Sequence, residues 1–204
     1  MENVVHVPKL PILIACGFSP SEILLKAMDK PLDHFRAQGY DITVIPFRLG
    51  DMRDVQTFAG HIVLEVGAAR VTRPGLKVNL VGLSMGGVAG MYAIKRLGIA
   101  EYVDTFVGVG APFYGSFWSW FAVTTGVFKR TGSQLSLGSP FLQKLRDEPL
   151  PDGPRYVTIA GSDDRICPPK TALLPGTDQH VEKFDHNAIF RKRKVFERVF
   201  CHCR

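Results

Sequence analysis

The sequence predicts an α/β fold, with a mostly parallel sheet of about six strands and helices on both of its faces. The first observation is that apolar runs alternate with segments of helical periodicity, and strands separated by helices are typical of parallel sheets. The second is that 204 residues suffice for one domain with a sizeable core. The third is a composition of 46% hydrophobic and 22% charged residues, which is ordinary for a globular protein. We therefore expect a single domain over residues 1–204.

The apolar runs define the expected strands and the periodic segments define the helices between them. The first helix carries start signals, because Ser19 can act as N-cap, Pro20 suits the first helical position and Glu22 stands three residues after the serine. Gly39 follows its last turn, as glycine commonly does at a helix end. The expected strands are 11–16, 41–46, 77–83, 103–109, 155–160 and 180–184, and the expected helices are 20–38, 54–70, 86–97, 138–147 and 186–200.

The pentapeptide Gly-Leu-Ser-Met-Gly at 82–86 is the strongest functional signal in the chain. It follows the apolar run 78–81 and precedes the helical pattern of 87–94. A serine at such a strand–turn–helix corner is lifted out of the sheet, and small glycines beside it avoid a collision with the neighbouring strand and helix. This pattern of a nucleophile elbow predicts that Ser84 is a catalytic nucleophile.

A serine hydroxyl needs a general base within hydrogen-bond reach and a third group that orients this base. Behind such an elbow the order along the chain is serine, acid, histidine. Three histidines follow Ser84: His186 at the junction of the last strand and the last helix, His180 before that strand at its opposite edge, and His202 in the tail. The place of His186 at the carboxyl end of a strand predicts that it is the base.

The orienting acid should follow the strand before His186. Two adjacent aspartates, Asp163 and Asp164, lie in the loop after strand 155–160. One of them is expected to hold the histidine tautomer and to stabilise the imidazolium, whereas turn formation or helix capping is the ordinary role of the other. The residues alone leave the choice between them open.

An oxyanion hole requires two backbone N–H groups aimed at the developing negative charge. One is expected from Met85, the residue after the nucleophile, and the other from Phe18 in the loop after the first strand. Gly17 in this loop is expected to line the substrate site. Cys16 has two interpretations, a reactive thiol or a small buried hydrophobic residue, and the second is the more common at a strand end.

The aromatic stretch 113–121 breaks the regular alternation just after a strand end. It contains both tryptophans, Trp118 and Trp120, together with Phe113 and Tyr114. One interpretation is a buried excursion that fills a gap. The other is an apolar wall for substrate, because ligands bind at the carboxyl ends of strands in such sheets.

Charge and cysteine content restrict the other function classes. The net charge of +6 includes the basic run 191–194, which we interpret as a solvated helix face rather than a nucleic-acid site, because no aromatic interleaving or motif accompanies it. At most a peripheral lipid contact is expected. Four cysteines are too few for a disulfide framework and match no zinc spacing. The terminal Cys201-His202-Cys203-Arg204 has two interpretations, adventitious metal binding or a frayed tail, and a frayed tail is expected. No membrane-spanning run or signal peptide is visible, which favours a cytoplasmic location.

Together these motifs resemble the α/β-hydrolase superfamily, and within it the compact esterase/lipase group, from about residue 11 to 189. The register of the acid loop selects Asp164 over Asp163, since in the family the aspartate stands just before a residue-Ile/Val-x-Pro-Pro run. Cys16 replaces the usual histidine. The matching segments are Gly-Leu-Ser-Met-Gly-Gly-Val-Ala at 82–89, Gly-Ala-Pro-Phe-Tyr-Gly-Ser at 110–116, Leu-Gly-Ser-Pro-Phe-Leu at 137–142, Gly-Ser-Asp-Asp-Arg-Ile-Cys-Pro-Pro at 161–169 and Asp-His-Asn-Ala-Ile at 185–189.

The resemblance implies a minimal α/β-hydrolase fold with no separate cap domain, because the chain is short for the superfamily. It implies hydrolysis of carboxylic esters through an acyl-enzyme, with Ser84, Asp164 and His186 as a catalytic triad and a small-molecule or lipid ester as substrate. No metal and no cofactor are expected. Two alternatives remain, an acyltransferase that uses the same site and a non-catalytic binding relative.

Overall fold

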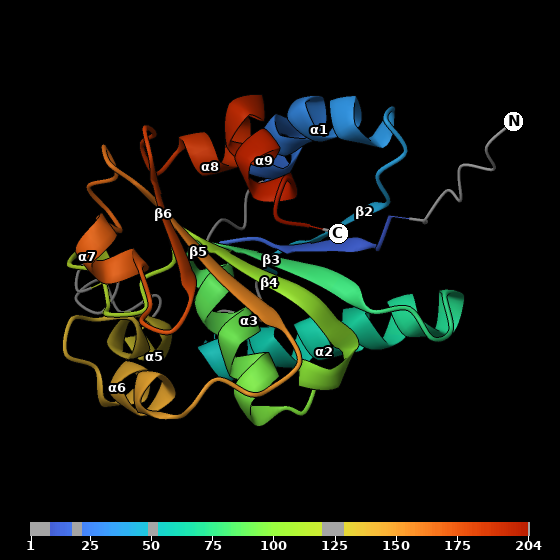
Figure 1. The fold of residues 1–204 in the computed structure, drawn as a ribbon. Coiled ribbons are helices and arrows are strands. Elements are labelled where there is room, and N and C mark those ends of the chain that lie inside the picture. The colour runs from blue at the N-terminus through green and yellow to red at the C-terminus, as the bar shows by residue number, and fades with distance from the viewer. Residues whose placement is uncertain (1–8, 18–21, 49–52, 120–128, 204) are drawn as a thin grey trace, which may run out of the picture.

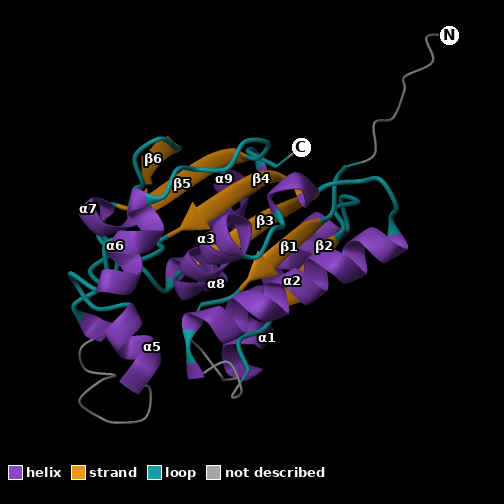
Figure 2. Ribbon diagram, turned by 90° about the horizontal axis from the view of Figure 1, so that it is seen from below, coloured by secondary structure: helices purple, strands orange, loops and turns teal. Residues whose placement is uncertain are grey.

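The computed structural model describes residues 9–17, 22–48, 53–119 and 129–203. Within these ranges every strand belongs to one sheet of six parallel strands, in the order β2-β1-β3-β4-β5-β6, and Figure 2 shows this order across the sheet. The predicted fold class is therefore confirmed. The strands are β1 (Ile12–Ala15), β2 (Ile42–Ile45), β3 (Val78–Leu83), β4 (Val103–Val109), β5 (Arg155–Gly161) and β6 (Asp178–Glu182).

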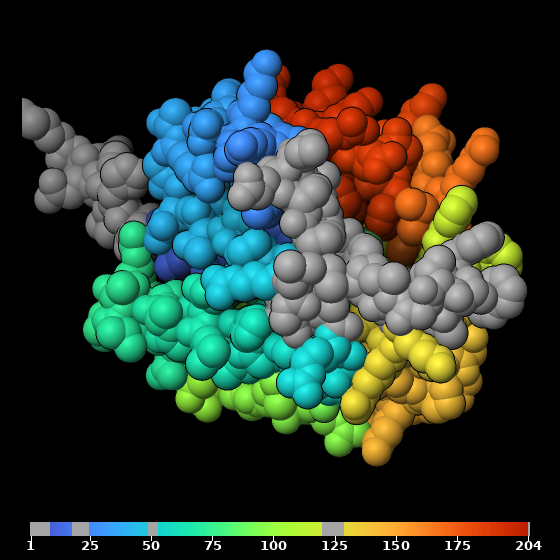
Figure 3. Space-filling view, turned by 180° about the vertical axis from the view of Figure 1, so that it is seen from behind, coloured from blue at the N-terminus to red at the C-terminus, as the bar shows by residue number. Residues whose placement is uncertain are grey.

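Helices cover both faces of the sheet (Figure 1). One apolar layer joins the sheet to α2, α3 and α6, and the other joins it to α1, α8 and α9. Seen from behind, the first helix lies against the C-terminal segment (Figure 3), where α1 contacts α8 and α9. The helices are α1 (Glu22–Arg36), α2 (Val55–Thr72), α3 (Met85–Arg96), α6 (Pro140–Asp147), α8 (Ala188–Arg191) and α9 (Arg193–Phe200).

The order of the strands positions a site at the carboxyl ends of β1 and β3. The chain passes from β1 to β2 on one side and then to β3 on the other side of β1. In open α/β sheets, ligands bind in the crevice at such a reversal, outside the carboxyl ends of the strands. Residues 16–17 follow β1, and Ser84 follows β3.

The expected elements are present, with three differences. The last strand runs from Asp178 to Glu182 instead of 180–184, so His180 lies within β6 and not before it. The expected helix 186–200 is two helices, because the backbone of Lys192 is extended, with φ −99° and ψ 118°. Three short elements were not predicted: the 3-10 helix η2 (Ala100–Tyr102), α5 (Lys129–Gln134) and α7 (Pro169–Ala172).

Two expectations remain, one for the start of the first helix and one for the C-terminal turn. The start signals at Ser19 and Pro20 lie outside the described residues. The terminal turn is not frayed up to residue 203, because the N–H groups of Cys201, His202 and Cys203 donate to carbonyls of α9 at 3.1–3.2 Å. Among the helices described, none is long and apolar enough to cross a bilayer.

Candidate active site

Ser84 occupies the corner between β3 and α3 in a strained backbone conformation. Its φ of 53° and ψ of −125° make it the one residue other than glycine with a positive φ in the described part of the chain. The Ser84 N–H donates to Val109 O at 2.8 Å, and its carbonyl accepts from Gly87 N at 2.9 Å. Both bonds fix the corner from the neighbouring strand and from the helix, so the side chain projects from the carboxyl end of the sheet.

The glycines of the corner are required by close backbone packing. A Cβ atom at Gly86 would overlap the carbonyl of Ala15 in β1, and one at Gly82 would overlap the backbone of Gly87. Nothing larger than hydrogen fits at either position without moving backbone. The start of α3 therefore lies directly against β1 and β3, which brings its first N–H groups to the serine.

His186 follows β6 and precedes α8, and its ring joins Ser84 to the acid loop. Nε2 lies 3.0 Å from Ser84 Oγ, and Nδ1 lies 2.7 Å from Asp164 Oδ2. The residue is 9% exposed, and its ring packs edge-on against Phe190 at 6.3 Å. Asp185 fixes the segment, since its Oδ1 accepts from Ala188 N at 2.9 Å.

Asp164, and not Asp163, is the aspartate that faces His186. It is 2% exposed, and its Oδ1 accepts from the backbone N–H groups of Ile166 and Cys167 at 2.8 and 2.7 Å. These two bonds leave Oδ2 for the imidazole. Asp163 is exposed and accepts from the Ser162 hydroxyl at 3.2 Å.

Cysteine thiols near the site are buried and protonated. Burial raises the pKa of Cys16 to about 12, and its Sγ lies 3.6 Å from Met28 Sδ. Burial also raises the pKa of Cys167 well above its ordinary value, and the negative charge of Asp164 adds to this rise. Cys16 is thus a small core residue, the second of its two interpretations.

The expected oxyanion donors are partly described. Met85 is the first residue of α3, and the first N–H groups of a helix lack intrahelical acceptors. Phe18 lies outside the described residues. Gly17 adjoins the serine, because a Cβ atom there would lie 2.7 Å from Ser84 Cβ and 3.2 Å from Phe190 Cζ.

The aromatic stretch divides into a buried part and an exposed part. Phe113 is 1% exposed and packs in the core layer of α2 and α3, so its ring does not form a surface. Tyr114 is half-buried, and the Arg146 guanidinium lies 4.2 Å from its ring centroid. Trp118 is 56% exposed, and Trp120 lies outside the described residues. Of the described residues in the expected wall, Phe117 and Trp118 face solvent.

The structure does not bring the two other histidines to Ser84. His180 pairs in register with Ile159 of β5, and its Nε2 lies 3.2 Å from Asp178 Oδ1. Its placement before the strand was wrong because the polar segment 178–182 forms the edge strand. His202 follows α9 and lies beside His180.

Two positions near the acid were not singled out from the sequence. Gly110 has φ +54°, and a Cβ atom there would lie 3.2 Å from Asp164 Oδ2 and 3.6 Å from His186 Nδ1. Ser116 is buried, and its hydroxyl donates to Ile166 O at 2.7 Å, which ties the aromatic stretch to the acid loop. The signal for Gly110 was its position directly after β4, the strand beside the elbow.

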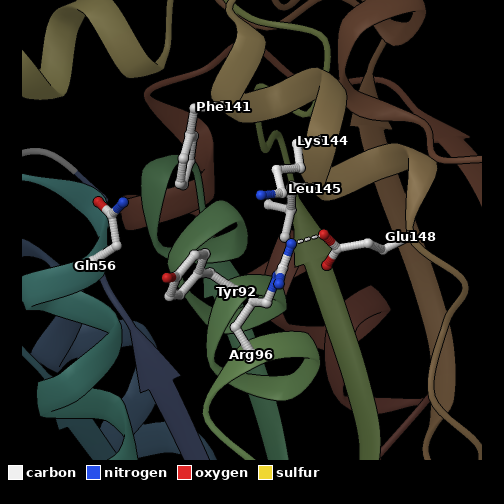
Figure 4. Close-up of a pocket in the computed structure, with 7 residues that line it drawn as sticks. All are labelled: Gln56, Tyr92, Arg96, Phe141, Lys144, Leu145 and Glu148. Carbon is white, nitrogen blue, oxygen red and sulfur yellow. Dashed lines mark hydrogen bonds and ion pairs between the residues drawn. The ribbon is translucent and has the colours of Figure 1, made fainter.

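A separate hollow lies between α3 and α6, away from the elbow. Its volume is about 210 Å³, and Figure 4 shows Arg96 and Glu148 paired within it. Ser84, Asp164 and His186 are not among its lining residues, which are Gln56, Tyr92, Arg96, Phe141, Lys144, Leu145 and Glu148. This hollow is therefore distinct from the candidate active site.

Comparison with known proteins gives structural but no sequence-level matches. No family model matches the chain, and no curated protein matches it. The chain is similar to the mature lipase BlEst2 of Bacillus licheniformis, with TM-score 0.79, 21% identity and coverage of 96% of this chain and 91% of that one.

Two metagenomic enzymes are similar as well. The carboxyl esterase MGS0156 gives TM-score 0.74 at 15% identity and covers 90% of this chain and 66% of its own. The α/β-hydrolase MGS-MChE2, from lagoon sediments of Mar Chica in Morocco, gives 0.68 at 21% identity and covers 95% and 89%. At such identities the likeness establishes the fold, and this chain has the α/β-hydrolase fold that these lipases and esterases share.

Proposed function

We propose that this chain is a serine carboxylic-ester hydrolase, an esterase or lipase in which Ser84, His186 and Asp164 act as nucleophile, base and orienting acid. The observation that carries the proposal is the continuous chain of contacts from Ser84 Oγ through both ring nitrogens of His186 to Asp164 Oδ2, at 3.0 and 2.7 Å. Serine nucleophiles are activated by this arrangement on several unrelated folds. The names of the similar structures, lipases and esterases, support the same reaction class.

The first half of the reaction forms an acyl-enzyme. Ser84 Oγ attacks the ester carbonyl carbon while its proton passes to His186 Nε2, and Asp164 stabilises the resulting imidazolium. The carbonyl oxygen becomes an oxyanion that accepts hydrogen bonds from the N–H of Met85 and, we propose, of Phe18. The C–O bond then breaks, and the alcohol leaves with the proton from His186.

The second half repeats these steps with water. His186 Nε2 takes a proton from water as the water oxygen attacks the acyl carbon, and collapse of the intermediate returns that proton to Ser84 Oγ. The free acid leaves and the starting state is restored. Every proton and electron pair is accounted for by these groups, so the proposed cycle requires neither a metal ion nor an organic cofactor.

The proposed substrates are esters of apolar acids, small or lipid-like. The large exposed side chains of Phe117 and Trp118 follow β4, the neighbour of the elbow strand. Neighbouring exposed aromatic residues favour contact with an apolar ligand. Gly17 adjoins Ser84, where a Cβ atom would lie 2.7 Å from Ser84 Cβ, so the proposed substrate carbonyl would pass beside a residue without a side chain.

Labelling with a fluorophosphonate, together with hydrolysis of p-nitrophenyl esters, tests the proposal. Ser84→Ala should lose labelling and about 10⁴ to 10⁶ in turnover, because removal of a triad member costs that much in serine hydrolases. Ser162→Ala is the matched control, since this serine is exposed on the acid loop, and it should keep both. A folded Ser84→Ala protein that retains near-native turnover would contradict the proposal. Product analysis in added glycerol distinguishes hydrolysis, which yields free acid, from acyl transfer.

A further inference from the structure

The edge strand β6 has polar side chains on the face of the sheet that packs against α1, α8 and α9. Asp178 and His180 pair in register with Val157 and Ile159 of β5, and paired residues of neighbouring strands point to the same face. Val157 and Ile159 belong to the core layer of α1, α8 and α9. The two polar side chains therefore point toward the same side as α9.

The turn after α9 brings a second imidazole to this edge. The ring centroids of His180 and His202 are 4.6 Å apart. One ligand atom from each of Asp178, His180 and His202 lies within 4.8 Å of the other two. His180 Nε2 is shielded from solvent and makes no hydrogen bond of normal geometry within the described residues, although Asp178 Oδ1 is 3.2 Å away.

An arginine side chain holds the carboxylate of this cluster in place. The Arg155 guanidinium, 2.5 Å from Asp178 Oδ2, lowers the pKa of Asp178, so this carboxyl is ionised at neutral pH. Burial lowers the pKa of His202, and the nearby His180 and Arg155 lower it further, whereas the Asp178 carboxylate raises it. A neutral imidazole keeps the lone pair that a metal ligand needs. Arg198 is the other cation that acts on His202.

We propose that Asp178 Oδ1, His180 and His202 form a binding site for a divalent transition metal, with Zn²⁺ as the preferred ion. Two imidazoles and one carboxylate match the ligand types of zinc, and a water molecule completes four-coordination. Zn–N bonds of ~2.0–2.1 Å place tetrahedral donors about 3.3 Å apart, close to the 3.2 Å between His180 and Asp178. Arg155 on Oδ2 is an outer partner of the kind that orients ligating carboxylates.

The site is structural and lies apart from the ester chemistry. It joins β6 to the turn after α9, and the segment between them contains His186, α8 and α9. A metal ion at this position links both ends of the segment that carries the proposed base. Its loss should lower thermal stability and leave the chemical step of the folded enzyme intact.

Titration of the chelator-treated full-length protein with ZnCl₂ and CoCl₂ tests the site. Wild type should bind one equivalent by calorimetry, with a higher melting temperature in Zn²⁺, and Mg²⁺ or Ca²⁺ should not reproduce the shift because these ions prefer oxygen ligands. His202→Ala, His180→Ala and Asp178→Asn should each weaken Zn²⁺ binding at least tenfold, since even outer-shell losses cost about 10–100-fold. His34→Ala, an exposed histidine on α1, is the control and should bind as wild type.

The thiols of Cys201 and Cys203 are the alternative ligands that the experiment must exclude. Cys201→Ser and Cys203→Ser should retain Zn²⁺ binding, and the Co²⁺ complex should lack a thiolate charge-transfer band. Binding that disappears in these serine variants and persists in His180→Ala and Asp178→Asn would assign the metal to the tail thiols and overturn the proposal. The proposal would also be overturned if wild type bound Zn²⁺ no more tightly than the triple variant His180→Ala, His202→Ala, Asp178→Asn. His202→Ala lies in the terminal turn, so its circular dichroism spectrum should remain native.

Discussion

Replacement of Asp164 by asparagine should trap His186 in the wrong tautomer. The Oδ1 position accepts two backbone N–H groups, from Ile166 and Cys167, and an amide NH₂ cannot replace oxygen there. The asparagine oxygen must therefore keep this position, and its NH₂ must take the place of Oδ2, 2.7 Å from His186 Nδ1. Nδ1 then accepts, the ring proton moves to Nε2, and Nε2 can no longer receive the proton of Ser84.

The expected cost is a fall of about 10⁴ in kcat, the loss that this substitution causes in a serine protease triad. At 1.36 kcal/mol for each factor of ten, this is about 5 kcal/mol of transition-state stabilisation. The free energy of unfolding should change by only about 1 kcal/mol, because the two backbone hydrogen bonds of the Asp164 side chain persist. A large loss of activity with nearly native stability is thus the signature of a tautomer effect.

The assay measures kcat and KM for p-nitrophenyl butyrate, together with the melting temperature of each variant. Asp163→Asn is the matched control, since Asp163 is adjacent, exposed and paired with Ser162 instead of a histidine. It should stay within about twofold of wild type, because surface substitutions rarely exceed ±0.5 kcal/mol. The reasoning is refuted if Asp164→Asn keeps kcat within tenfold of wild type, or if Asp163→Asn carries the large loss.

Three further predictions concern the surroundings of the site. Gly17→Ala should lower kcat/KM at least tenfold, because the methyl group would lie 2.7 Å from Ser84 Cβ; unchanged kinetics would contradict this. Trp118→Ala should remove the gain of up to about 0.8 kcal/mol per acyl methylene and spare acetate esters, with an unchanged melting temperature because Trp118 is exposed; a uniform loss with lower stability would exclude the wall. Native Cys16 should resist iodoacetamide at pH 8, because its pKa is raised to about 12 and its thiol stays protonated, whereas exposed Cys201 should be labelled in peptide maps.

Local patterns predicted most of the fold because the central strands are predominantly apolar and almost entirely buried. β1, β3 and β4 have buried residues on both faces, and their sequences are correspondingly rich in apolar residues. β6 was displaced by two residues because its sequence, Asp-Gln-His-Val-Glu, has little apolar content and its pairing with β5 determines its extent. The break between α8 and α9 at Lys192 was also missed. Both helices pack against α1, and this tertiary packing is not visible in the local sequence.

The proposed site combines local and long-range information. The setting of Ser84 is encoded within a few residues, so the corner was predicted. The choice between Asp163 and Asp164 depends on which carboxyl faces a histidine far along the chain, and only the family resemblance indicated it. The role of Gly110 depends on a positive φ beside Asp164, and its position directly after β4 does not by itself indicate that approach.

At Ser84 the stability of the fold and the proposed activity make opposite demands on one residue. A non-glycine residue at φ 53° and ψ −125° carries about 1–3 kcal/mol of strain, while the hydrogen bond to His186 contributes only about 0.5–1.5 kcal/mol. Glycine adopts a positive φ without strain, so a Ser84→Gly change would relieve the backbone strain. Selection for folding alone would therefore favour glycine over serine at this position. Serine at such a position is expected where selection acts on the hydroxyl itself, as the proposed nucleophile requires. Mutational drift in a lineage released from that selection should therefore replace Ser84 before it erodes the sheet that supports it.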